Sequence, residues 1–107
     1  MSETAAREHI ARFNTAVTSG NWSAFTAPLH DEAVMTFIGP PVGPFRGRDA
    51  ITRAYESDPP GDTMRVVGVE SASDTDLVTF EWSRGGTGTL TLGYRDGRIA
   101  ALTVRFL

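Results

Sequence analysis

The chain has 107 residues, of which 40% are hydrophobic and 21% are charged, and its formal net charge is −3 at pH 7. This length predicts one domain spanning residues 1–107 with a hydrophobic core of its own. Cysteine and lysine are both absent, since all ten basic residues are arginines. Disulfides, thiolate nucleophiles and lysine Schiff-base chemistry are therefore excluded.

The charge pattern and the apolar runs narrow the expected partners. The arginines are dispersed, so we do not expect nucleic acid to bind. No apolar run approaches the roughly 20 residues of a membrane span, and no membrane association is expected. Met1-Ser2-Glu3-Thr4 has neither the basic start nor the apolar stretch of a signal peptide, which predicts a cytoplasmic location. His9 and His30 show no ligand spacing, so we expect no metal and no cofactor.

Thr4–Ser19 reads as an amphipathic helix. Its apolar residues recur at spacings of three and four, which is one face of a helix: Ala6, Ile10, Phe13 and Val17. Arg7, Glu8 and Arg12 are assigned to the face that contacts water, with His9 beside Glu8.

Two short helices and a strand follow. Asn21 is expected to cap a helix that runs through Ala27 and is stopped by Pro28. Val34–Ile38 is short, apolar and β-branched, which predicts a buried strand. The stretch 39–47 holds three glycines and three prolines and is predicted to be a stiff loop. Asp49–Ser57 is predicted to be helical, with Ile51, Ala54 and Tyr55 on its inward face.

The remainder of the chain predicts four strands joined by turns rich in Gly, Asp and Ser. Their expected ranges are Met64–Val69, Leu77–Arg84, Thr89–Arg95 and Ile99–Phe106. Alternation along the second of them points Val78, Phe80 and Trp82 to one face and Glu81 to the other. A sheet with one apolar face packs that face against its helices.

Three segments and their order resemble the nuclear transport factor 2-like superfamily, which includes ketosteroid isomerases and SnoaL-like polyketide cyclases. The segments are Ser19-Gly20-Asn21-Trp22, His30-Asp31-Glu32-Ala33-Val34, and Phe45-Arg46-Gly47-Arg48-Asp49-Ala50-Ile51. The resemblance covers essentially the whole chain. It implies an α+β cone-shaped barrel, in which a curved mixed sheet wraps around three N-terminal helices. It also implies a mostly apolar pocket between sheet and helices and a homodimer formed through the outer sheet faces.

The catalytic residues of ketosteroid isomerases are mostly not matched. The position of the oxyanion tyrosine falls on Phe13, and that of the base falls near Phe37 or on Pro40. The position of the protonated acid falls near Leu90, and only the supporting tyrosine has a match, at Tyr55. Isomerisation by that mechanism is therefore not expected.

Several polar residues remain candidates, each with a structural alternative. Tyr55 could orient a ligand carbonyl or act as a weak acid, or it could be a core tyrosine bonded to a backbone carbonyl. Asn14 could face the pocket, or it could lie at the edge of the apolar face and contact water. Glu81 becomes a buried base only if its strand slips by one residue. Asp58 and Asp62 are better explained by helix termination and turn formation than by acid–base chemistry.

The sequence thus predicts a cavity open at one end. Either this cavity is shallow and wet, or a partner subunit closes it, or Phe106 and its neighbours plug it. Its expected ligand-binding residues are Phe13, Asn14, Phe37, Tyr55, Phe80, Trp82, Leu102 and Val104. Two functions remain open. One is an isomerase- or cyclase-like enzyme that acts on a small apolar molecule, and the other is a non-catalytic module that binds such a molecule or only dimerises.

Overall fold

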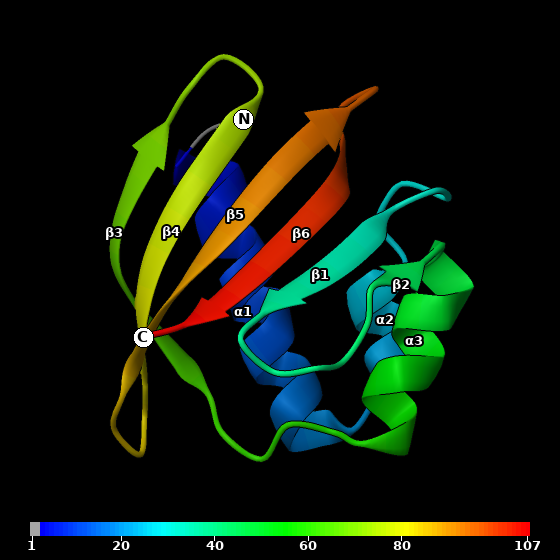
Figure 1. Ribbon diagram of the computed structural model, residues 1–107, viewed down its shortest axis with the longest axis horizontal. Helices are drawn as coiled ribbons and strands as arrows, with labels where there is room; N and C mark the ends of the chain where they lie inside the picture. The colour runs from blue at the N-terminus through cyan, green and yellow to red at the C-terminus, as the bar shows by residue number, and fades with distance from the viewer. Residues whose placement is uncertain (1–2) are drawn as a thin grey trace.

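The computed structural model describes residues 3–107, which form three helices and six strands (Figure 1). The helices are α1 (Glu3–Ser19), α2 (Trp22–Thr26) and α3 (Arg48–Ser57). The strands are β1 (Val34–Ile38), β2 (Phe45–Arg46), β3 (Met64–Ser71), β4 (Thr75–Trp82), β5 (Thr87–Arg95) and β6 (Arg98–Phe106). Within this part of the chain, no helix is both long and apolar enough to cross a membrane.

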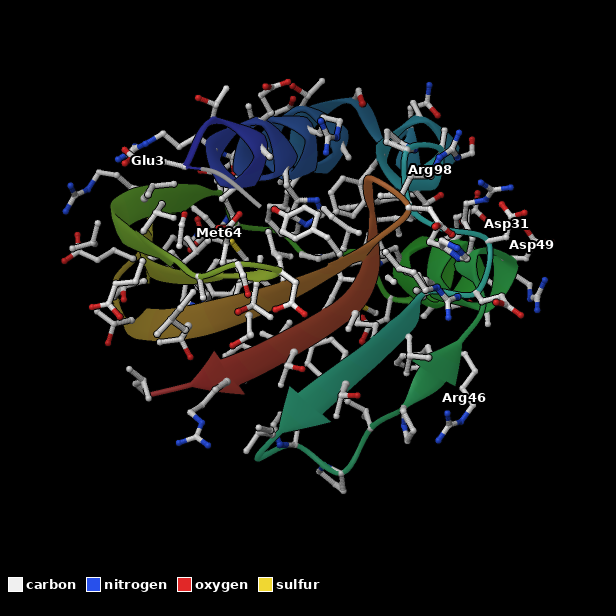
Figure 2. The ribbon with its side chains drawn as sticks, turned by 90° about the horizontal axis from the view of Figure 1, so that it is seen from above. Glu3, Asp31, Arg46, Asp49, Met64 and Arg98 are labelled. Atoms are coloured by element: carbon white, nitrogen blue, oxygen red, sulfur yellow. The ribbon has the colours of Figure 1, made fainter. Side chains whose placement is uncertain are left out.

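All six strands belong to one mixed sheet in the order β2-β1-β6-β5-β4-β3. β1 and β6 run parallel, and the other neighbouring strands run antiparallel. The sheet is curved and does not close, and Figure 2 shows α1 lying over its concave side. This arrangement confirms the predicted cone-shaped α+β fold with a curved mixed sheet and three helices.

The alternation of side chains along the strands is confirmed. Val78 and Phe80 are fully buried on the helix-facing side. Glu81 lies on the opposite face, where it forms an ion pair with Arg65 of β3, so the strand has not slipped. The expected bounds of this strand were shifted by two residues: β4 is Thr75–Trp82, and Ser83 and Arg84 belong to the turn that follows.

Two further expectations are corrected by the structure. The stretch 39–47 is not loop throughout, because Phe45 and Arg46 pair with Met35 and Val34 of β1. His9 does not contact water: it is only 2% exposed and packs on the ring of Phe25, with ring centroids 5.0 Å apart. The reason is that α2 covers a second side of α1, so the buried arc of α1 is wider than one apolar stripe.

Candidate binding site

A pocket of about 380 Å³ opens at one end of the molecule, between β1, the β1–β2 loop, α3 and the end of β6. Most of its lining side chains are apolar, and the full set is Met35, Phe37, Pro40, Val42, Phe45, Ala54, Tyr55, Asp58, Pro60 and Phe106. Its volume and composition resemble those of small-molecule sites in proteins.

Three phenylalanines shape the wall of this pocket. Phe37 meets Phe45 edge to face and lies parallel to Phe106, with both pairs of ring centroids 6.3 Å apart. Phe106 is also nearly parallel to Trp82, again at 6.3 Å. Phe106 is 45% exposed. Its ring lines the pocket on one side and contacts Trp82 of the interior on the other.

The interior behind that wall is filled by aromatic side chains. Phe13 contacts the rings of Trp22, Phe25, Tyr55 and Trp82. Of the eight residues predicted to bind a ligand, Phe37 and Tyr55 line the pocket. Four others, Phe13, Phe80, Leu102 and Val104, are buried in the core, and Trp82 packs against that core. These side chains fill the interior of the cone behind the pocket wall.

Tyr55 brings a polar group to the apolar wall. Its ring stacks on Trp22 with centroids 4.6 Å apart and planes 6° from parallel, which fixes its direction. Burial raises the pKa of Tyr55, so the phenol stays protonated at neutral pH. Its hydroxyl makes no hydrogen bond to any residue in the range 3–107. The backbone carbonyl partner that the core alternative requires is therefore not found there.

Asp58 supplies the carboxylate in the lining, at the rim of the pocket. It follows α3 directly, and its backbone N–H donates to Ala54 as the helix ends. Asp62 does not accompany it: the carboxylate oxygens of Asp62 accept from the backbone N–H groups of Thr63 and Arg84, at 2.8 and 3.0 Å. Asp62 thus stabilises a turn, as the sequence suggested.

Asn14 joins α1 to β3. Its side-chain Nδ2 donates to the Met64 carbonyl and its Oδ1 accepts from the Met64 N–H, both at 2.8 Å. Figure 2 shows Met64 on β3, beneath α1. Because both polar atoms of the amide are bonded to backbone, they are engaged in the fold rather than exposed to the pocket.

The sequence reasoning missed a buried polar pair at the other end of the sheet. Asp76 is fully buried, and the Tyr94 hydroxyl donates to its carboxylate at 2.7 Å. The signal was present, because Asp76 shares the inward parity of Val78 and Phe80. Among residues 3–107, no three His, Asp or Glu side chains are grouped as a metal ion would require.

Comparison with known proteins agrees with this geometry. A family model described as a SnoaL-like domain matches residues 10–105. No curated protein matches the chain.

Three solved structures illustrate the similarity. A SnoaL-like protein of unknown function from Burkholderia thailandensis is 13% identical with a TM-score of 0.77, covering 100% of this chain and 98% of its own. A proposed ketosteroid isomerase from Kribbella flavida is 16% identical with a TM-score of 0.74, covering 94% and 76%. A proposed polyketide cyclase from Sinorhizobium meliloti is 19% identical with a TM-score of 0.70, covering 91% and 93%. At these identities the likeness shows the fold, which is that of the nuclear transport factor 2-like superfamily.

Proposed function

This chain belongs to the family of SnoaL-like domains, and on that premise we propose that it binds a small, mostly apolar molecule carrying at least one oxygen. The observation that carries the proposal is the Tyr55 hydroxyl, which has no hydrogen-bond partner among residues 3–107 and lies in a wall otherwise built largely of apolar side chains. A few polar groups in an apolar wall are typical of ligand pockets.

The arrangement favours a flat ligand. Phe37 and Phe106 are parallel to within 6°, and Phe45 presents its edge to Phe37. An aromatic or polycyclic ligand can stack on such rings with a favourable offset geometry. The protonated Tyr55 hydroxyl can then donate a hydrogen bond to a ketone or hydroxyl oxygen of the ligand.

A matched pair of probes tests this proposal. We expect 2-naphthol to shift the NMR resonances of residues around the pocket, and 2-methylnaphthalene to do so more weakly. In Tyr55→Phe, the affinity for 2-naphthol should fall about 2- to 10-fold, the effect of one hydrogen bond, while that for 2-methylnaphthalene stays unchanged. Equal losses for both probes, or no shifts around Phe37 and Phe45, would refute the proposal.

A second candidate function is proton transfer, and the observation that favours it is Asp58 in the same lining as Tyr55. The Asp58 carboxylate would accept a proton from the carbon next to a ligand carbonyl, and the Tyr55 hydroxyl would stabilise the enolate oxygen. This would be isomerase- or cyclase-type chemistry. In D₂O, 2-tetralone should then exchange its α-protons faster with the protein than without it, and Asp58→Asn should abolish the difference. If the protein does not accelerate this exchange, the proton-transfer function is refuted and only the binding function is retained.

We also propose that two copies associate through the outer face of the sheet. This face carries the exposed apolar side chains Ile38, Leu77 and Leu107 in one depression with three threonines and Arg105. The Arg65–Glu81 pair on the same face offers both charge signs to a copy related by a two-fold axis.

Light scattering should report a dimer for the wild-type chain. Leu77→Arg should shift it towards the monomer, because the substitution places a charge in the apolar centre of the interface. Thr15→Ala, on the exposed side of α1, is the control. A wild-type monomer at all concentrations would contradict this assignment.

A further inference from the structure

A second hollow lies at the opposite end of the sheet from the pocket. Residue pairing separates the two: Phe106 pairs with Gly88 at the start of β5, whereas Tyr94 near its end pairs with Ile99. The hollow has a volume of about 220 Å³, and its polar lining consists of Glu8, Arg12, Tyr94 and Arg98. Figure 2 shows Arg98 at the start of β6, close to the helices. This is space for a small molecule only.

Arg12 is the unusual side chain of this hollow. Its Nε is buried and has no hydrogen-bond partner among residues 3–107. Glu8 lies four residues earlier on α1, a spacing at which an ion pair forms readily. Arg7 forms such a pair with Glu3 at 2.8 Å, yet no ion pair joins Arg12 to Glu8 or to any other described residue. The Arg12 Nε is buried without a protein acceptor in the described part of the chain, although the residue as a whole is partly exposed.

Within residues 3–107, the side chains beside Arg12 offer its Nε no acceptor. His9 is 2% exposed, and its Nδ1 also lacks a partner within the described part of the chain. Burial, and secondarily the charge of Arg12, lower the pKa of His9 to about 3, so His9 is uncharged at neutral pH. The Tyr94 hydroxyl already donates a hydrogen bond to the Asp76 carboxylate. A buried Nε–H without an acceptor is costly, and such donors are normally paired.

We propose that this hollow binds a small oxyanion, with Arg12 and Arg98 as its ligands. Two arginines and the carboxylate of Glu8 lie in the lining, and Asp76 places a second carboxylate behind Tyr94. This small excess of positive charge in the lining favours a monocarboxylate over a phosphate dianion. Arginine recognises either group through paired N–H donors. Such a site would be separate from the pocket at Tyr55, so an anionic ligand and an apolar one could be bound by one molecule.

NMR titration of the arginine Nε–H resonances tests the site directly. Sodium acetate and sodium phosphate are the probes, each compared with sodium chloride at equal ionic strength. We expect the Arg12 Nε–H to shift with acetate, and Arg98→Gln to weaken that binding about tenfold through loss of a charge-assisted hydrogen bond. Arg46→Gln, which removes an exposed arginine on β2, is the matched control and should bind as the wild type does.

Each outcome has a defined meaning. A shift with either anion supports an oxyanion site, and the stronger of the two identifies its class. The proposal is overturned if neither anion moves the Arg12 resonance beyond the effect of chloride. It is overturned equally if Arg98→Gln and Arg46→Gln have the same effect. Arg98 is exposed, so Arg98→Gln should fold as the wild type does. A weaker affinity in this variant would therefore report on the site itself.

Discussion

Within residues 3–107, the ionisable side chains of Asp76 and His9 are buried, and their surroundings shift the pKa of each towards a different charge state. Desolvation would raise the pKa of Asp76, but hydrogen bonds that include those from Ser71 and Tyr94 outweigh it and lower the pKa. Asp76 is therefore held as a carboxylate. His9 has no comparable support for its charged form, because burial and the nearby Arg12 both favour the neutral imidazole. Asp76 is therefore charged in the folded chain, where hydrogen bonds stabilise its carboxylate, whereas His9 is neutral.

The neutral state of His9 predicts a stability that depends on pH. Its pKa is about 3 in the folded chain, whereas an imidazole exposed to water in the unfolded chain has its ordinary pKa of 6.5. Between these values the unfolded chain binds more protons, so the free energy of unfolding is highest above pH 6.5 and falls as the pH decreases. The largest slope from one such group is about 1.4 kcal/mol per pH unit.

Urea unfolding of His9→Leu at pH 7 and at pH 4.5 measures this effect. The variant should lose less stability than the wild type on going to the lower pH, since it has no imidazole to protonate in the unfolded state. Thr15→Ala, which removes no titrating group, should keep the wild-type dependence. If His9→Leu and the wild type lose the same free energy of unfolding between pH 7 and pH 4.5, another group causes the loss of stability at low pH.

At the scale of the elements, the pairing of β5 with β6 depends on a glycine. A Cβ added at Gly88 would lie 2.6 Å from Cζ of Phe80 and 2.8 Å from the Arg105 carbonyl oxygen. Phe80 is fully buried and cannot move aside without disturbing the core. Gly88 therefore lets the core ring and the neighbouring strand approach each other closely.

Gly88→Ala is expected to lower the free energy of unfolding by about 1–3 kcal/mol through overpacking. Gly68→Ala is the matched control, because Gly68 is also a strand residue and an added Cβ meets nothing within 4 Å there. That variant should change stability by no more than about 0.5 kcal/mol. Chemical denaturation of the two variants side by side measures this difference. Equal free energies of unfolding would contradict the close approach at Gly88.

Elements with a strong local signal could be predicted from the sequence, and elements made by distant partners could not. Val34–Ile38 was predicted with its observed bounds, because an apolar β-branched run between turn residues needs no further information. Phe45–Arg46 was missed, since a two-residue strand in a stretch of glycine and proline exists only through its pairing with β1. His9 was misplaced because α2 covers α1 from a second side.

The same distinction applies to the candidate site. Parity and helix face correctly oriented Val78, Phe80 and Tyr55 towards the interior, but parity does not say how much of the interior is empty. That depends on how large rings interlock, as when Phe13 meets Trp22 and Trp82. Asn14 illustrates the limit, since its backbone partner, Met64, lies 50 residues away. The ligand-binding set therefore remains a prediction.

At the scale of the whole molecule, the aromatic core separates two hollows at opposite ends of the sheet. Rings in contact lead from Phe106 through Trp82 and Phe13 to Phe25 and His9. Protein interiors packed in this way hold few voids large enough for water. The depth of the pocket is consequently set where this chain of rings begins, at Phe106.

Phe106→Ala should deepen the pocket at modest cost to stability. Phe106 is 45% exposed, whereas Phe80 is fully buried. Phe80→Ala is therefore expected to cost about 3–5 kcal/mol, and Phe106→Ala clearly less, because much of its ring already contacts water. Removal of the Phe106 ring should favour 1-hydroxypyrene, a larger flat probe, over 2-naphthol when the affinity ratio is compared with that of the wild type. If the ratio stays constant, Phe106 does not limit the depth of the pocket, and the wall formed by Phe37 and Phe45 must do so.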